Sequence, residues 1–554
     1  MNDDSLANRR TVLKSLSAGT LAALAGCTGS DDSDETPTEG TQSDEDSGTT
    51  DETATEEPAN EELAYAWDDA TWDSYWYSLY NMSTNIAMSG NGVTFPATEQ
   101  QQETFQNRLP EMLSTAGESE PPVKEPNLNM APFTRGDPQF TEKPTLEGED
   151  GRPDASTLGW DTSAASGVVS PASLAWTHLK GVTWAKNFQT HFDILPDSLA
   201  AEFRSMLLST LAQVGTVFAL VPEQGGGNFR LNDENLLLAS EFRPGEGVVD
   251  DTPRPHHHSA MLWFLSGLNS LAQNEWYGYV NPEPLIPAEN IQMLTNGMGK
   301  TTMNAVSPEA VPDTRTAGAL LGAMGWFGTQ TNKEQLRSGA VDYANTLAGV
   351  VEEELDGNGR VAGGAENQAA TQGIVGQGLT WASQLDGVDH TDTAEDVLGY
   401  LRDDLFDEDA RTFASGADDD TYRITARDAG DITGGVNAAD AVLGMDIRDQ
   451  YAQFFNQTLN RGRLQRAQRP PSRSDDEEHA PPLPPAAGGE FGQAAVYNAA
   501  VEYDTGADEW SVVDDTFDTA GALYLSNQEI WISQWGGDFY RGRGVPGRSE
   551  SPPA

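Results

Sequence analysis

Apolar residues recur at helical spacing over most of the second half of the chain. Between residues 197 and 221 they fall three or four positions apart, behind an Asp197-Ser198 pair that is typical of a helix start. The same pattern predicts further helices at 259–276, 288–304, 314–329, 332–355, 366–385, 391–405, 437–460, 490–504 and 514–535. Strand patterns are few and short, at 421–426 and 510–513. The sequence therefore predicts a mainly α body.

The segment before this body is irregular but dense in aromatic residues. They are Tyr65, Trp67, Trp72, Tyr75, Trp76, Tyr77 and Tyr80. Such a density favours a helix docked into the core over a ligand platform. Residues 117–160 are rich in Pro, Gly, Asp and Glu, which predicts a long surface loop. We therefore expect an aromatic-rich N-terminal segment at 64–163, an α-helical body at 164–545 and a disordered tail at 546–554.

Two short motifs repeat along the body. Diglycines at 363–364, 434–435 and 488–489 are each followed by Asn or Glu and then by alanines. Residues 316–320, Thr-Ala-Gly-Ala-Leu, reappear at 519–523. A diglycine allows a sharp turn, and alanines let the next helix pack closely, so the motifs predict repeated helical hairpins.

Ten to twelve helices paired in this way make the body similar to an (α/α) toroid, the ring of six helical hairpins found in glycosidases, lyases and sugar epimerases. The resemblance covers roughly residues 197–540 and rests on helix number and turn style. It implies a closed helical ring. An open α-solenoid of the same hairpins is the alternative.

The first 27 residues read as an export signal. Arg9 and Arg10 precede an apolar run at 15–25, which is too short for a transmembrane helix, and Leu24-Ala25-Gly26 lead into Cys27. The pattern resembles a twin-arginine signal followed by a lipobox. The resemblance implies export by the twin-arginine machinery, a lipid on Cys27 and a location on the extracytoplasmic face of the membrane.

Residues 28–63 are expected to be a disordered acidic stalk. They consist of Ser, Thr, Asp, Glu, Gly and Pro with almost nothing apolar, so they cannot bury enough surface to offset the entropy of ordering. Cys27 is the only cysteine of the chain. Once it carries a lipid, disulfides, thiolate metal sites and cysteine nucleophiles are all excluded from the mature protein.

The chain is strongly and evenly acidic. Its formal net charge is −55, from 87 Asp and Glu against 32 Lys and Arg, and only seven of the cations are lysines. This composition resembles that of haloarchaeal proteins adapted to molar salt, where the Debye length falls to about 3 Å. Nucleic-acid binding is disfavoured, because neutralising phosphates requires a basic face.

Acidic residues near the diglycines are the candidate catalytic groups. Glu366 and Glu490 occupy similar places in two of the motifs, and Asp431 precedes the third. A glycosidase needs two carboxylates about 5–5.5 Å apart for retention or about 6.5–9.5 Å apart for inversion, a distance that sequence cannot supply. The alternative role for each is a solvated or helix-capping carboxylate.

Aromatic and basic residues supply the candidate ligand-binding groups. Trp381 and Trp535 lie near the motifs and are suited to stacking on sugar rings, although core packing is the alternative. Arg463 and Arg466 belong to a dense arginine run, and Arg541 lies in a second run near the C-terminus. Arginine binds carboxylate and phosphate bidentately, but pairing with nearby acidic residues is the competing interpretation.

Metal and cofactor motifs are weak or missing. Three consecutive histidines stand at 256–258 without the i, i+4 spacing of a helical metal pair, so a polar loop or a helix start is the preferred interpretation. We find no nucleophile-elbow, P-loop, dinucleotide-binding or c-type haem motif, and we expect no metal and no cofactor.

Together these patterns favour a lipid-anchored, extracytoplasmic protein whose helical ring binds a carbohydrate-like or anionic ligand. A glycoside hydrolase or polysaccharide lyase that uses Glu366, Glu490 and Asp431 is the enzymatic alternative. A non-catalytic structural role in the cell envelope is the third. Whether the protein is an enzyme stays open at this point.

Overall fold

The computed structural model describes most of the chain beyond the stalk. The described residues are 65–82, 89–95, several positions between 103 and 113, 128–145, 154–191, 201–364, 366–417, 419–466 and 492–533. The export signal, the lipobox, the expected stalk and the expected tail all lie outside them. No helix among the described residues is long and apolar enough to span a membrane.

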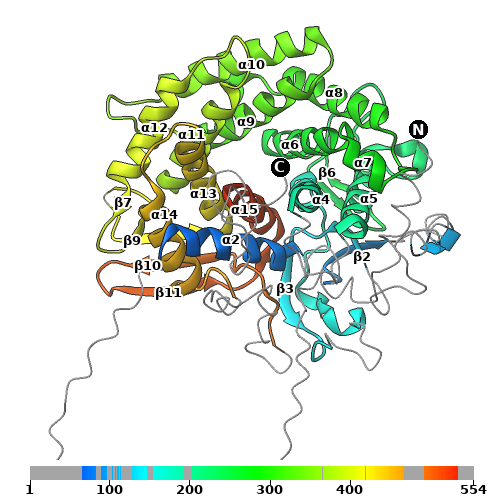
Figure 1. The fold of residues 1–554 in the computed structure, drawn as a ribbon, viewed down its shortest axis with the longest axis horizontal. Coiled ribbons are helices and arrows are strands. Elements are labelled where there is room, and N and C mark those ends of the chain that lie inside the picture. The colour runs from blue at the N-terminus through cyan, green and yellow to red at the C-terminus, as the bar shows by residue number, and fades with distance from the viewer. Residues whose placement is uncertain are drawn as a thin grey trace, which may run out of the picture.

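Six helices in the described part of the chain form a closed inner ring (Figure 1). They are α4 (Pro171–His191), α6 (Pro255–Ala272), α9 (Thr314–Gln330), α11 (Gln368–Ala382), α13 (Ala426–Ala441) and α15 (Thr519–Trp531). Each packs against the next, and α15 packs back against α4. Because the last helix meets the first, the mainly helical body is an (α/α) toroid, as predicted, and not an open solenoid.

A second layer of helices surrounds the ring. Four of them, each packed on the inner helix before it, are α5 (Ala201–Leu220), α8 (Ala288–Ala305), α10 (Glu334–Glu353) and α12 (Thr391–Asp404). The short α7 (Glu275–Val280) precedes α8, and α14 (Arg448–Phe454) continues into the π-helix η8 (Phe455–Arg461). The aromatic-rich helix α2 (Trp67–Met82) packs against α15 and completes the layer. All of α2 is buried except the partly exposed Asp68 and Asp69, so its aromatics are core residues, as predicted.

The inner helices all run in the same direction. The backbone of Gly318 in α9 lies against Ile374 in α11, and further along both helices Gly325 lies against Trp381. Matching contacts join α11 to α13, α13 to α15, α15 to α4, α4 to α6 and α6 to α9. The ring therefore has an N-face, where the six helices begin, and a C-face, where they end.

The connections on the two faces differ in length. On the C-face, residues 331–333 join α9 to α10, and residues 442–447 join α13 to α14. On the N-face the corresponding links span 221–254, 405–425 and 462–518 and contain most of the strands. Loops held by a rigid scaffold are the usual place for binding residues, so the N-face is where a site is expected.

The strands form small antiparallel sheets around these links. The pairs are β1 (Gly92–Phe95) with β2 (Leu128–Pro132), β5 (Glu241–Arg243) with β6 (Gly247–Asp250), and β7 (Phe406–Asp407) with β8 (Thr412–Phe413). The triplets are β4 (Trp160–Asp161), β3 (Arg135–Phe140) and β12 (Phe517–Asp518), and β9 (Thr421–Thr425), β10 (Ala500–Asp504) and β11 (Glu509–Asp514). The pairing of β3 with β12 joins the N-terminal segment to the end of the body.

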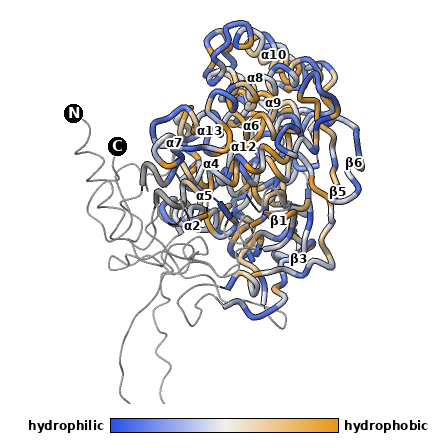
Figure 2. Tube along the Cα trace, turned by 90° about the vertical axis from the view of Figure 1, so that its right-hand side faces the viewer, coloured by the Kyte–Doolittle hydropathy of each residue, from blue (hydrophilic) through white to orange (hydrophobic). Residues whose placement is uncertain are grey.

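Burial explains why the two layers have different sequence patterns. In α10 the buried residues recur every three or four positions, which gives one apolar face and one solvated face. In α11 nearly every residue is buried, because neighbours contact the helix on all sides. Figure 2 shows hydrophobic colours along the inner helices and hydrophilic colours around α10 and β6.

Side chains fill the ring interior between its two ends. Toward the C-face, the indole of Trp263 lies 5.5 Å from that of Trp326, 6.0 Å from that of Trp381 and 5.7 Å from that of Trp531, measured between centroids. Closer to the N-face, the side-chain amides of Gln377 and Gln528 donate to each other's oxygens at 2.9 and 3.1 Å. Both layers lie deeper in the ring than the first turns of the inner helices.

Four element predictions differ from the structure. Residues 117–160 were expected to be a surface loop, but their described part contains the fully buried strand β2 and the strand β3. The range 490–504 was expected to be helical, but its described C-terminal part is strand β10. The expected helix at 437–460 is instead α13, which begins at residue 426, followed by α14 and η8. The diglycine at 434–435 lies inside α13. Side chains at these two positions would clash with Gln377 and Gly373 of α11, so the glycines allow the two helices to pack closely. The helix α4 was not predicted, because it is buried on all sides and has no amphipathic pattern.

Lowering the pH should reduce the stability of this fold through His178, a buried residue of α4. Its Nε2 donates to the Met130 carbonyl at 2.8 Å, and burial lowers its pKa from 6.5 to about 4. The unfolded chain therefore binds a proton between these values while the folded chain does not, so stability falls as pH drops from about 6.5 to 4. We expect His178→Gln to remove up to about 3 kcal/mol of this pH dependence, because each pKa unit is worth about 1.4 kcal/mol. Denaturant unfolding of both proteins across this pH range in molar KCl checks it.

Candidate functional site

The N-face gathers polar side chains from the first turns of the inner helices. The carboxylate of Asp313 caps α9 by accepting from the Thr316 amide at 2.6 Å. Asn367 caps α11 through the Ala370 amide at 2.9 Å, and Thr425 caps α13 in a reciprocal capping box with Asp428. Several helix starts, each with the positive end of its macrodipole, therefore share one face of the ring.

Arg315 joins the starts of α9 and α13. Its Nη2 lies 2.6 Å from Oδ1 of Asp428 and 2.6 Å from Oδ2 of Asp431. Its Nε also lies 2.6 Å from Oδ2 of Asp431. The side chain of Arg315 is 17% exposed. One guanidinium on α9 thus holds two carboxylates of α13, the second helix along the ring, with most of its surface withdrawn from water.

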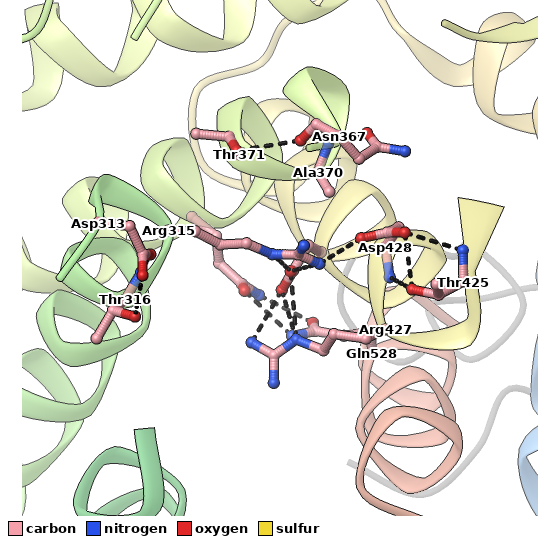
Figure 3. Close-up of polar contacts among 12 residues, drawn as sticks. Asp313, Arg315, Thr316, Asn367, Ala370, Thr371, Thr425, Arg427, Asp428 and Gln528 are labelled. Atoms are coloured by element: carbon pink, nitrogen blue, oxygen red, sulfur yellow. Dashed lines mark hydrogen bonds and ion pairs between the residues drawn. The ribbon is translucent and has the colours of Figure 1, made fainter. Parts of the chain in front are cut away.

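A second arginine approaches the same carboxylate. Nε of Arg427 lies 3.2 Å from both oxygens of Asp431, and its Nη2 lies 3.1 Å from Oδ1. Asp431 itself is fully buried. Figure 3 shows the guanidinium groups of Arg315 and Arg427 pointing to the same place between the helices, with Asp428 beside them. We call Arg315, Arg427, Asp428 and Asp431 the mouth cluster.

Aromatic rings fix the orientation of Arg427. Its guanidinium carbon lies 3.6 Å from the centroid of Tyr524 and 5.8 Å from that of Trp176. Both rings are buried, and their own centroids are 4.8 Å apart. A cation over a buried ring is attracted by its quadrupole, by about 2 kcal/mol when it is desolvated. Arg427 is therefore held on one side by aromatic faces and on another by Asp431.

Each arginine keeps one nitrogen without a partner. The contacts of Arg315 use Nε and Nη2, and so do those of Arg427. Within the described part of the chain, Nη1 of either residue has no hydrogen-bond acceptor and no carboxylate against it. The mouth cluster thus leaves two cationic Nη1 groups, one on each arginine, without an acceptor among the described residues.

Histidines 256–258 form the first turn of α6, as the helix-start interpretation predicted. The pKa of His256 is lowered to about 4, mainly by desolvation and then by the positive charges of Arg427 and Arg254, while Asp313 opposes the shift. Burial also lowers the pKa of His257, whose ring lies 4.1 Å from that of His256. Both imidazoles are therefore neutral at neutral pH.

The predicted catalytic carboxylates do not form a described pair. Asp431 is in the mouth cluster, where two arginines occupy it. Glu366 lies exposed in the loop before α11. Glu490 lies outside the described residues. Carboxylates held by guanidinium groups accept hydrogen bonds, so the arrangement favours a positioning role for Asp431 over proton transfer.

The predicted ligand-binding residues lie apart from the mouth cluster. Arg466 donates from Nε to Gln493 at 3.2 Å, and burial lowers its pKa. Arg463 is exposed and has a left-handed backbone, with a φ of 61°. Trp381 stacks on Trp326 near the C-face, with centroids 6.0 Å apart. The remaining predicted positions, Arg541, Trp535, Cys27, Arg9 and Arg10, lie outside the described residues.

Two other polar features lie away from the mouth cluster. Lys180 and Glu529 are fully buried where α2, α4 and α15 meet; Lys180 donates to Ser78, and Glu529 accepts from Tyr497. Both side chains are inaccessible to solvent. They lie where α15 meets α4 and the ring closes, so we assign them a structural role. A groove of about 500 Å³ lies between α8 and α10, lined in part by Lys300, Glu309, Asp342 and Tyr343. The described residues contain no cluster of three or more His, Cys, Asp or Glu suited to a metal ion.

Comparisons with known proteins identify only distant structural neighbours. No protein-family model and no curated protein matches the chain. A cellobiose 2-epimerase from Bacillus thermoamylovorans B4167 is 11% identical over 65% of this chain and 88% of its own, with a TM-score of 0.41. A sugar epimerase from a ruminal bacterium is 8% identical over 67% and 89%, with a TM-score of 0.42. A reducing-end-xylose releasing exo-oligoxylanase bound to xylose is 9% identical over 66% and 82%, with a TM-score of 0.36.

Proposed function

We propose that this protein binds a small anionic, carbohydrate-like ligand at the N-face of its toroid, outside the cytoplasm. The observation that supports the proposal is the pair of guanidinium groups on Arg315 and Arg427, each fixed by carboxylates and each with Nη1 unpartnered. Arginines fixed in this way bind an anion at a lower cost in side-chain entropy than mobile surface arginines.

The surroundings of the two arginines also favour an anion. Helices α9, α11 and α13 begin at this face, and their macrodipoles place partial positive charge there. His256 is neutral at neutral pH, so the positive charge at this face comes from the arginines and the helix starts. The net charge of the chain is −55, so a site with unpartnered cationic donors differs in charge from most of the protein.

The proposed location rests on the sequence of the export signal. Arg9, Arg10 and the apolar run would direct the folded chain through the twin-arginine machinery, and a lipid on Cys27 would anchor it to the membrane. Residues 28–63 would then hold the toroid away from the surface. Mass spectrometry of the native protein tests this: we expect a mature N-terminus at a lipid-modified Cys27, and an intact, unmodified N-terminus would contradict it.

Substitution of Arg427 tests the proposed binding site. We expect the full-length chain in molar KCl to bind at least one of glucuronate and glucose 6-phosphate, and to bind neutral glucose at least tenfold more weakly. Arg427→Gln should weaken anion binding about tenfold to a hundredfold, because a hydrogen bond to a charged group contributes about 1.5–3 kcal/mol. Isothermal titration calorimetry measures both effects.

The matched control for this experiment is Arg402→Gln. Arg402 lies on the outer helix α12 and pairs with the adjacent Asp403 at 2.7 Å, so its removal should leave binding unchanged. Equal affinities of the wild type and of Arg427→Gln for every anion that binds would place the site elsewhere. Failure of both anions to bind the wild-type chain would also contradict the proposal.

A further inference from the structure

We infer that Glu529 carries a proton in the folded protein and that this proton stabilises the closure of the ring, so that raising the pH weakens the junction of α15 with α4 and α2. Two observations carry the inference. Glu529 lies on α15, which packs against both α4 and α2 where the ring closes, and its carboxyl lacks partners that could balance a negative charge. The inference is separate from the proposed function, because neither the mouth cluster nor a ligand takes part in it.

Hydrogen bonds around Lys180 join the three helices at this junction. Nζ of Lys180 on α4 donates to the carbonyl and the hydroxyl of Ser78 on α2, and to the carbonyl of Ser526 on α15 at 3.3 Å. The Ser78 hydroxyl donates in turn to the Ser526 carbonyl at 2.7 Å. All three residues are fully buried. The three N–H groups of an ammonium thus have three oxygen acceptors, so Lys180 does not need Glu529 as a hydrogen-bond partner.

Glu529 is also fully buried, but its carboxyl has a single partner. Oε2 accepts from the hydroxyl of Tyr497, while Oε1 has no hydrogen-bond donor among the described residues. Within the described part of the chain, no basic side chain forms a salt bridge with either oxygen. A buried carboxylate needs a cation or several hydrogen bonds to offset the loss of its hydration. The neutral, protonated acid is therefore the form that suits these surroundings.

The groups that face Glu529 from the neighbouring elements agree with this protonation state. Burial raises the pKa of Glu529 from 4.5 to about 8. The hydrogen bond from Tyr497 and the positive charge of Lys180 oppose this shift, whereas the negative charge of Asp73 on α2 adds to it. Burial also raises the pKa of Tyr497, and that of Tyr451 on α14, so both phenols stay protonated across the range in which Glu529 titrates.

The pH dependence follows from the difference between the folded and the unfolded chain. Between pH 4.5 and about 8 the folded chain keeps the proton of Glu529, whereas the unfolded chain loses it. Because the folded chain binds more protons, raising the pH favours unfolding, and this one group changes the unfolding equilibrium constant by up to about tenfold per pH unit. Burial lowers the pKa of Lys180, which gives an effect of the opposite sign. Comparison with a variant of Glu529 that keeps Lys180 therefore isolates the proposed effect.

Urea unfolding of the full-length wild type and of Glu529→Gln between pH 5 and pH 8 in molar KCl tests the inference. Glutamine keeps the size of the side chain but does not titrate in this range. We expect the ratio of the unfolding equilibrium constants, wild type over variant, to rise about tenfold per pH unit. A ratio that stays constant or falls as the pH rises would overturn the inference, because the folded chain would then hold no extra proton on Glu529.

Glu334→Gln is the matched control. Glu334 lies on the outer helix α10 with 87% of its side chain exposed, so the corresponding ratio should not change with pH. Glu529→Met, which is apolar and of similar length, is a second neutral variant and should show the same trend as Glu529→Gln. If neither neutral variant folds at pH 6, the inference also fails, because it requires the folded ring to hold a neutral side chain at this position.

Discussion

Replacing Asp431 with alanine should lower the free energy of unfolding by about 3–5 kcal/mol, the usual cost of removing one partner from a buried ion pair. Asp431 is fully buried and is the shared acceptor of Arg315 and Arg427, with contacts of 2.6 and 3.1 Å. Without it, two guanidinium groups lose their main neutralising partner inside the ring. Denaturant unfolding in molar KCl measures the loss.

The control for Asp431 is an exposed carboxylate with a similar short contact. Asp403 lies 2.7 Å from Arg402 on α12, and its side chain is 58% exposed. Because solvent and salt screen such pairs, Asp403→Ala should change stability by less than about 1 kcal/mol. If Asp431→Ala unfolded as readily as the wild type and Asp403→Ala, the mouth cluster would not hold α9 and α13 together.

Adding a methyl group at Gly378 should destabilise the toroid by several kcal/mol. A Cβ at this position in α11 would lie 2.2 Å from the Gly318 carbonyl oxygen and 2.9 Å from its carbon, both in the backbone of α9. Backbone atoms cannot rotate out of the way, so the two inner helices would have to separate. Overpacking of this kind costs about 1–3 kcal/mol or more. The melting temperature of Gly378→Ala in molar KCl reports the effect.

The same substitution on the outer layer should act in the opposite direction. Gly349 lies within α10, and a Cβ there would meet no atom within 4 Å. Because alanine is the better helix former, Gly349→Ala should stabilise the protein by about 0.5–1 kcal/mol. A Gly378→Ala variant as stable as Gly349→Ala would show that the inner helices do not approach as closely as described.

The sequence predicted helices in both layers, including the inner α9 to within one residue, but it missed the inner α4. The expected ranges 288–304 and 332–355 agree closely with α8 and α10, because these helices expose one face and therefore show a clear period. Helix α4 shows no such period, since it is buried all round. The diglycine at 434–435 was interpreted as a turn, yet it lies inside α13, where small residues allow contact with α11. The local sequence favoured a turn at this diglycine, but close packing of α13 against α11 determined the observed structure.

The candidate site was only partly accessible from sequence. The sequence indicated Asp431 by its position near a diglycine, and it left His256–His258 as a polar loop or a helix start, of which the structure shows the helix start. The sequence did not single out Arg315 and Arg427, because neither belongs to the dense arginine runs near residues 461–473 and 541–548. More than 100 residues separate them, and Arg315 reaches Asp431 only because α9 and α13 both pack against α11. An arginine just after a capping residue was the available signal, as in Asp313-Thr314-Arg315 and Thr425-Ala426-Arg427.

A crystal structure of the full-length chain with saturating glucuronate tests the central claim most directly. The account predicts the ligand at the N-face, with its carboxylate within hydrogen-bond distance of Nη1 of Arg315 or of Nη1 of Arg427. Ligand found beside Trp381 at the C-face, or in the groove between α8 and α10, with the N-face empty, would contradict it.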